Sequence, residues 1–234
     1  MLKKLDDRLF LIGVAHVLPK SADEVEEIIT RERPEIVAVE LCPARYLALT
    51  QGGKRPGPLD TLRAGPKLTI LSALIYLLQD KFSRQTGMPA GEEMLVAVKR
   101  AREVGARVEL IDRDIGLTLQ RLIDCMPWRE RFRLFGELLL GLLPFGKRVE
   151  LEHLTEEQIV DYLLSELKRA SPTAYEVLIR ERDTYMASRL AMLLSGGSRV
   201  VCVVGAGHVP GIYERLRKGV SGSWGMSLRY RVGG

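Results

Sequence analysis

The chain contains little cysteine, which argues against a disulfide framework. Its three cysteines, Cys42, Cys125 and Cys202, lie far apart, are odd in number and form no C-x-x-C pair. This pattern is neither that of a small secreted disulfide scaffold nor that of a paired-cysteine zinc site. Cys42 and Cys202 end or interrupt apolar runs, so we expect buried free thiols in a reducing compartment.

Apolar runs long enough to cross a membrane are also missing. The longest, at 68–78 and 134–146, fall short of the ~20 residues that a bilayer requires. The chain begins with a strand-like segment and has acidic residues where a cleavable signal would need apolar ones. We therefore expect a domain that is soluble as given.

Several common catalytic motifs are absent as well. The sequence contains no P-loop, no H-E-x-x-H and no G-x-S-x-G. The segment GAGHVPG at 205–211 resembles a dinucleotide fingerprint, but Pro210 stands where the third glycine should be. The remaining chain is too short to supply the strand that would carry a ribose-binding acid, so a dinucleotide site is not expected.

The composition is that of one globular domain. Of 234 residues, 46% are hydrophobic, which is enough for a sizeable core. The formal net charge of +5 comes from 35 basic and 30 acidic residues. Such a mixed surface suits an anionic membrane or an acidic ligand and identifies neither. Nucleic acid is not expected as a partner.

The order of apolar segments predicts an α/β fold with a mainly parallel central sheet flanked by helices. Continuous apolar runs indicate buried strands at 8–15, 36–41, 107–112 and 198–208. Amphipathic segments between them predict helices and right-handed crossovers. Segment 51–67 predicts an exposed loop, and a helix is expected at 67–83. The last ten residues could form an edge strand.

Residues 114–195 show only helical patterns. They predict a large helical insertion before the last core strand, a lid or subdomain that partly covers the site. We expect residues 1–234 to form a single domain. Within the insertion, the charged run at 180–183 favours a solvated helix face, and His153 favours a surface position.

Polar residues end each of the four predicted strands. His16 ends the first in the motif G-V-A-H, Glu40 ends the second, Arg113 follows the third between two aspartates, and His208 ends the fourth in G-A-G-H. Ligands bind at the carboxyl ends of the strands in open parallel sheets. We therefore expect residues remote in sequence to meet at this edge.

These strand-end residues suit a metal site. His16 and His208 are two of only three histidines, and each closes a Gly-x-x-His motif. Glu40 lies in an apolar strand, where a carboxylate is costly unless it meets a cation or a hydrogen bond. It could pair with Arg45 or Arg113, or act as a metal ligand or general base. Two histidines and one carboxylate fit a catalytic centre for zinc, manganese, cobalt or iron.

Longer segments of the sequence resemble the TraB/PrgY/GumN family, related to the Tiki proteins. The resemblance lies in the segment from GVAHVLPKSADEVEEI to VAVELCPARYLAL, in MPAGEEMLVAVKRAREVGARVELIDRDIG, in ERDTYMASRL and in VVGAGHVPGI. It implies a fold like those of the erythromycin-esterase-like and ChaN-like proteins. Tiki members are regarded as metal-dependent proteases that trim amino-terminal peptides. TraB and PrgY members are linked to the shutdown of peptide pheromones.

The resemblance also implies roles for individual residues. It gives a metal site of His16, His208 and Glu40 that holds a divalent ion such as Mn, Co or Zn. Four residues in the segments that resemble the family are candidates for catalytic roles: Glu40, Glu93, Arg113 and Glu181. Arg113 could hold a substrate carboxylate or stabilise an oxyanion, or only pair with neighbouring acids.

These observations predict a metal-dependent peptidase of the TraB/Tiki type, archaeal or bacterial. Two alternatives remain open. One is a non-catalytic module that sequesters a peptide with the 51–67 loop and the helical block. The other is a metal-free, esterase-like hydrolase with His16 as its base. A homodimer is allowed. Prokaryotic relatives often continue into carboxy-terminal membrane helices, so we expect either anchoring through such a region beyond this chain or a cytoplasmic protein.

Overall fold

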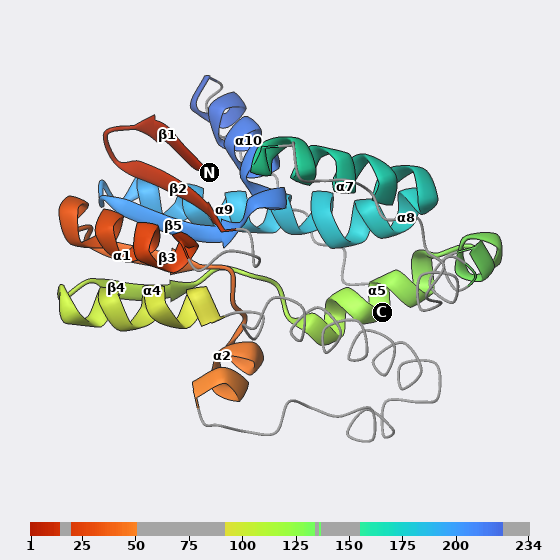
Figure 1. Ribbon diagram of the computed structural model, residues 1–234, viewed down its shortest axis with the longest axis horizontal. Helices are drawn as coiled ribbons and strands as arrows, with labels where there is room; N and C mark the ends of the chain where they lie inside the picture. The colour runs from red at the N-terminus through yellow and green to blue at the C-terminus, as the bar shows by residue number, and fades with distance from the viewer. Residues whose placement is uncertain (15–19, 51–91, 134–135, 137–154, 222–234) are drawn as a thin grey trace.

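A computed structural model describes residues 1–14, 20–50, 92–133, 136 and 155–221 (Figure 1). His16 and His153 lie outside these residues, as do the loop expected at 51–67, the helix expected at 67–83 and the edge strand expected at the end of the chain.

The centre of the fold is a five-stranded sheet in the order β1-β2-β5-β3-β4. Its strands, in chain order, are β1 (Leu2–Asp6), β2 (Leu9–Val14), β3 (Ile36–Val39), β4 (Arg107–Leu110) and β5 (Val200–Gly205). The four strands predicted from apolar runs pair in parallel, as expected. The sequence did not reveal β1, which pairs antiparallel with β2 at the edge of the sheet.

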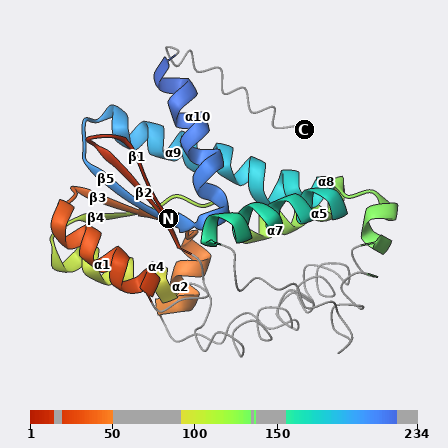
Figure 2. The same cartoon turned by 45° about the horizontal axis from the view of Figure 1, so that its top comes forward.

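Helices cover both faces of this sheet (Figures 1 and 2). On one face lie α1 (Lys20–Glu32) and α4 (Glu92–Glu103), and on the other lie α9 (Glu181–Ser195) and α10 (Val209–Ser221). Further helical elements are α2 (Pro43–Thr50), α5 (Ile115–Cys125), α7 (Glu156–Ala170), α8 (Pro172–Tyr175), the π-helical turn η2 (Glu176–Arg180) and the 3₁₀ turn η3 (Ala206–His208), and residues 128–133 are helical as well. The α/β class predicted from the sequence is confirmed.

The core follows from the alternation of side chains along the strands. In β2, Phe10 and Ile12 face α1 and α4, whereas Leu9 and Leu11 face α9 and α10. The central strand β5 is buried on both faces in the same way. Both faces therefore need apolar residues, and for this reason the strands read as continuous apolar runs rather than alternating ones.

Described residues within 114–195 are helical and include no strand. The helix α9 belongs to the core itself, because Met186, Ala187 and Leu190 pack against the sheet. A smaller apolar cluster joins α5 to α8 and η2 through Leu122, Met126, Ala174 and Val177. That these helices cover the site as a lid stays a prediction.

Two further expectations concern membranes and thiols. Among the described residues, no helix combines the length and the apolar character needed to span a bilayer. Cys42 and Cys202 are buried and unpaired, as the apolar runs indicated, and Cys125 is an exposed free thiol.

Candidate functional site

Residues that follow three parallel strands meet at one edge of the sheet. Glu40 comes directly after β3, and its backbone N–H donates to Val203 O of β5 at 3.0 Å. His208 lies in η3, three residues beyond β5. The Glu40 Oε1 and His208 Nε2 atoms are 3.4 Å apart. The structure therefore brings together the two described members of the predicted metal site, while its third member, His16, lies outside the described residues.

A buried aspartate orients His208. The Nδ1 atom of His208 lies 2.6 Å from Asp183 Oδ1, and both residues are almost fully buried, at 5% and 2% exposure. Asp183 stands in the first turn of α9, on the same helix face as the core residues Met186 and Leu190. The helix thus points a carboxylate at the imidazole from the face that packs against the sheet.

Arg182 joins the acidic groups of the site. Its Nε and Nη2 atoms donate to the two oxygens of Asp112 at 3.0 and 2.8 Å, the geometry of a bidentate pair. Nη2 also donates to Glu40 Oε1 at 2.5 Å, and Nη1 lies 3.0 Å from His208 Nε2. The guanidinium is mostly buried, with 15% of the side chain exposed. Its pKa is raised: burial acts to lower it, and the charges of Glu40 and Asp112 outweigh that effect.

These contacts indicate the tautomer of the imidazole. A guanidinium can only donate, so Nε2 of His208 accepts from Arg182 and carries a lone pair. The ring proton therefore resides on Nδ1 and is donated to Asp183.

Glu40 is ionised despite its burial. Burial by itself raises the pKa of this carboxyl, but the neighbouring His208 and the positive charge of Arg182, together with a hydrogen bond from the Gly205 N–H, lower it to about 2. That N–H donates to Glu40 Oε2 at 2.6 Å. A Cβ at position 205 would lie 3.2 Å from the same oxygen, so glycine allows this close approach.

Arg113 and Glu181, two of the predicted catalytic residues, bind each other rather than Glu40. Arg113 Nη1 donates to Glu181 Oε2 at 2.8 Å, and Arg121 of α5 adds a bidentate pair to the same carboxylate. Hydrogen bonds from Arg121 and Arg113 hold the pKa of Glu181 below its usual range, although burial opposes this. The sequence also allowed an ion pair between Glu40 and Arg45 or Arg113, but the ionic partner at hydrogen-bonding distance is Arg182.

Glu93 stands in the first turn of α4 and is 1% exposed. Because α4 ends just before β4 begins, its first turn lies toward the carboxyl edge of the sheet. A carboxylate is favourable at that end of a helix, since the backbone N–H groups there carry partial positive charge.

Sequence reasoning missed Arg182 and Asp183, which it assigned to a solvated charge run. Side-chain spacing held the missing signal for Asp183. Positions 183, 186, 187 and 190 follow the i, i+3, i+4, i+7 pattern of one helix face, and three of the four are apolar. An aspartate in phase with that face is expected to be buried, and a buried aspartate needs a donor.

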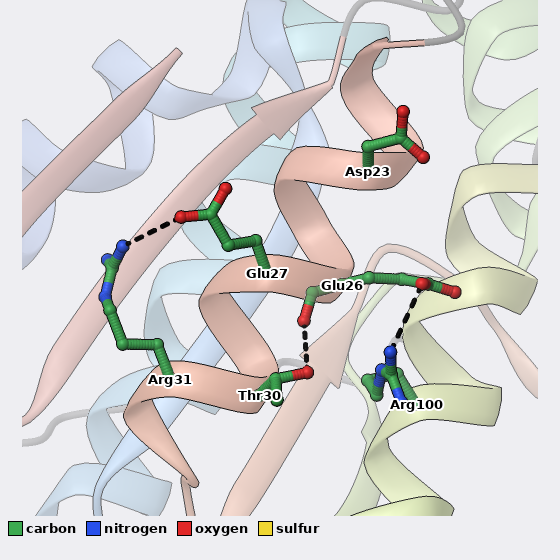
Figure 3. A pocket seen from close by; sticks show the side chains of 6 residues that line it. All are labelled: Asp23, Glu26, Glu27, Thr30, Arg31 and Arg100. Carbon is green, nitrogen blue, oxygen red and sulfur yellow. Dashed lines mark hydrogen bonds and ion pairs between the residues drawn. The ribbon is translucent and has the colours of Figure 1, made fainter.

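Among the hollows on the described surface, two differ in their relation to this site. One, of about 530 Å³, lies between α1 and α4 and is lined by surface residues in ion pairs, such as Glu26 with Arg100 (Figure 3). It contains none of the predicted site residues. The other, of about 400 Å³, lies between α7, α9 and α10 and reaches Asp183 beside Ile179 and Arg215.

The described part of the chain brings together two side chains of types that bind metal ions, which is fewer than a full ligand set. No group of three or more His, Cys, Asp or Glu side chains in it is placed to hold an ion. The donor atoms of Glu40 and His208 nevertheless suit a divalent metal ion. Two ligand atoms at ~2.1 Å from one tetrahedral ion lie ~3.4 Å apart, and this is the separation of Glu40 Oε1 and His208 Nε2. A carboxylate on the far ring nitrogen, here Asp183, is the usual partner of a metal-bound histidine.

The fold and the site define an α/β protein with a buried histidine–carboxylate–arginine cluster at the carboxyl edge of its sheet. The sequence pattern of the TraB/PrgY/gumN family matches residues 1–219, and the chain belongs to this family. It is 39% identical over 218 residues to an uncharacterized protein of Methanocaldococcus jannaschii. This match covers 90% of this chain and 53% of that protein. It is 28% and 27% identical over 232 residues to the human and mouse proteins named TraB domain-containing protein, covering 88% of this chain and 61% of each of them. The chain thus spans just over half the length of these relatives.

Proposed function

We propose that this domain hydrolyses peptide bonds with the help of a divalent metal ion, held by His208, Glu40 and His16. The observation that carries the proposal is the line of contacts from Asp183 through His208 to Glu40. It joins an oriented imidazole lone pair to an ionised carboxylate at the spacing of two ligands on one ion.

The residues of the chain contribute in distinct ways. Asp183 fixes the ring proton of His208 on Nδ1, so that Nε2 is free of a proton and can bind a cation. Glu40, with its pKa of about 2, is a carboxylate throughout the neutral range and can bind a cation or accept a proton. An ion bound there would polarise a carbonyl and make water more acidic.

The other candidates take supporting roles in this proposal. Arg113 and Arg121 hold Glu181 at the start of α9, directly before Arg182, so they position that turn of the helix. Glu93 remains a candidate to carry a proton, because it is buried toward the same edge. The cavity of about 400 Å³ beside Asp183 offers apolar walls, including Leu164 and Ile179, together with basic groups, including Arg215. Such a mixture suits a peptide side chain or terminus.

Turnover of a peptide library by the purified chain tests the proposal. Chelator should abolish cleavage, and manganese, cobalt or zinc should restore it. His208→Ala and Glu40→Gln should each remove activity by at least about 100-fold, the usual cost of losing part of a catalytic metal shell. Glu27→Gln is the matched control for Glu40→Gln, since Glu27 lies on α1 with 74% of its side chain exposed and should keep full activity.

Two results would contradict the proposal. Cleavage by the untreated protein that is indifferent to chelator would favour the metal-free hydrolase. Binding of peptides without any turnover, in the presence of each metal, would favour the sequestering module.

A further inference from the structure

We propose that Arg182 competes with the divalent ion for Glu40 and His208, so that the ion can enter only when the guanidinium withdraws. This inference rests on the proposed metal site and concerns how that site is loaded. The competition follows from the contacts of Arg182, which already occupies lone pairs of His208 and Glu40.

The competition is for the same atoms. The imidazole Nε2 of His208 has one lone pair in the ring plane, and Nη1 of Arg182 lies 3.0 Å from it. Oε1 of Glu40, the oxygen nearest to that nitrogen, accepts from Nη2 of the same guanidinium. An ion that bridges these two atoms must take up the lone pair on Nε2, so the arginine and the ion cannot both hold His208.

Arg182 has a second anchor that does not involve these ligands. Its Nε and Nη2 atoms hold both oxygens of Asp112, a residue that follows β4 rather than β3 or β5. Asp112 is itself held by its own loop, where its Oδ1 accepts from the backbone N–H of Arg113 at 2.8 Å. The guanidinium can therefore leave Nε2 and remain paired with Asp112, and loading requires a side-chain movement rather than unfolding.

The balance of buried charges predicts how loss of Arg182 changes the binding of a divalent ion. Glu40, Asp112 and Asp183 are all buried, and Arg182 is the cation that contacts the first two. Arg45 reaches Asp112 only at 3.9 Å, and Arg215 reaches Asp183 at 3.7 Å. Removal of the Arg182 charge leaves buried carboxylates in need of a cation, so a divalent ion should then both bind more tightly and stabilise the fold.

The test is a metal titration that does not depend on turnover. The purified chain is stripped with chelator and titrated with Co²⁺, with binding followed by calorimetry and by visible absorption, and thermal melting is recorded with and without the ion. Arg182→Gln should bind Co²⁺ at least about tenfold more tightly than the unmodified chain, because one hydrogen bond to a charged group no longer has to be broken. Its melting temperature should also rise more on addition of the ion.

Arg189→Gln is the matched control, because it removes the same charge from the same helix at a residue whose ionic partner is Glu109 rather than the ligand pair. It should leave the affinity for Co²⁺ unchanged. If Arg182→Gln does not fold without metal, Arg182→Lys replaces it. A lysine has a single nitrogen and cannot hold Asp112, Glu40 and His208 together, so this variant should also bind Co²⁺ more tightly than the unmodified chain.

The outcomes separate the two proposals. Equal Co²⁺ affinity in the unmodified chain and the Arg182 variant would overturn the competition and leave the metal site standing. Absence of binding by both proteins would overturn the competition and the metal-dependent function together.

Discussion

At the scale of single residues, Glu40 couples the charge of the site to the stability of the fold. Its pKa of about 2 in the folded protein lies below the ordinary value of 4.5, so folding favours its ionised form. A carboxyl whose pKa is lowered by folding stabilises the folded state fully when the pH is above its ordinary pKa. This stabilisation is lost as the pH falls toward the pKa of the folded protein. The pH window for this residue therefore runs from about 4.5 down to about 2.

We predict that Glu40→Gln lowers the free energy of unfolding by about 3 kcal/mol near neutral pH, the worth of such a shift. The difference from the unmodified chain should narrow as the pH falls through this window, because the native carboxylate is then protonated as well. Urea unfolding at a series of pH values measures the difference in stability and its dependence on pH. The exposed control Glu27→Gln should change stability by less than about 0.5 kcal/mol. A constant difference across the whole pH range would contradict the prediction.

At the scale of secondary-structure elements, the contact between α9 and α10 sets the position of Asp183. Gly211 lies in α10, opposite the aspartate, and a Cβ built there would stand 1.9 Å from Asp183 Oδ2. That distance is far below any van der Waals contact, so a side chain at 211 must push the carboxylate or the helix away. The glycine thus allows α10 to pack against the residue that orients His208.

Accordingly, Gly211→Ala should lower the free energy of unfolding by about 1–3 kcal/mol, the usual cost of overpacking. The hydrogen bond between Asp183 and His208 should weaken at the same time, and NMR of the imidazole nitrogens would report this. Gly196→Ala is the control, because Gly196 ends α9 at φ −75° and its nearest contact would be an ordinary 3.5 Å. Full stability and an unchanged imidazole spectrum in Gly211→Ala would show that α10 gives way without cost.

What the sequence could predict follows from how local each signal is. The four parallel strands and the meeting of Glu40 with His208 were predictable, because apolar runs and polar strand ends are read directly along the chain. The edge strand β1 was not, since it has only five residues and its exposed and half-buried positions mix charged with apolar types. The partners of Glu40 could not be predicted either. Arg45, Arg113 and Arg182 are equally plausible cations until the fold brings α9 to the edge of the sheet.

The π-helical turn η2 shifts the phase of the helical pattern between α8 and α9. It directly precedes Glu181, and its wider turn changes the angle at which the following residues leave the helix axis. A helix pattern projected from residue 172 at a constant 3.6 residues per turn therefore misplaces the charged run relative to α8, whereas the spacing of Asp183, Met186 and Leu190 within α9 is unaffected. The site residues Arg182 and Asp183 come immediately after this change of phase.

At the scale of the whole molecule, the strand order makes β5 indispensable. It lies between β2 and β3 and pairs in parallel with both, although it is the last strand along the described chain. Its residues contribute to the apolar layers on both faces of the sheet. Without β5, the strands β2 and β3 each lose the neighbouring strand with which they form parallel hydrogen bonds.

We predict that a chain ending at Gly197 does not fold cooperatively, because it lacks β5 and α10. A chain ending at Ser221 keeps all the described elements and should unfold in a single transition. Near-ultraviolet circular dichroism and urea titration of the two proteins make the comparison. A cooperative transition in the shorter chain would show that β2 and β3 can close the sheet without their central partner.

The central place of β5 also governs events during synthesis. A ribosome releases the chain from its amino terminus, so β2, α1, β3 and β4 emerge while the strand that must separate β2 from β3 is still unmade. Until β5 is made, the nascent chain carries two apolar strands with open edges, the kind of surface that chaperones recognise and that aggregates. Completion of the sheet and assembly of the Glu40–His208 pair must then occur together, when β5 inserts between its neighbours. A chain that has not yet made β5 cannot carry the Glu40–His208 pair, so this pair and the sheet form in one step.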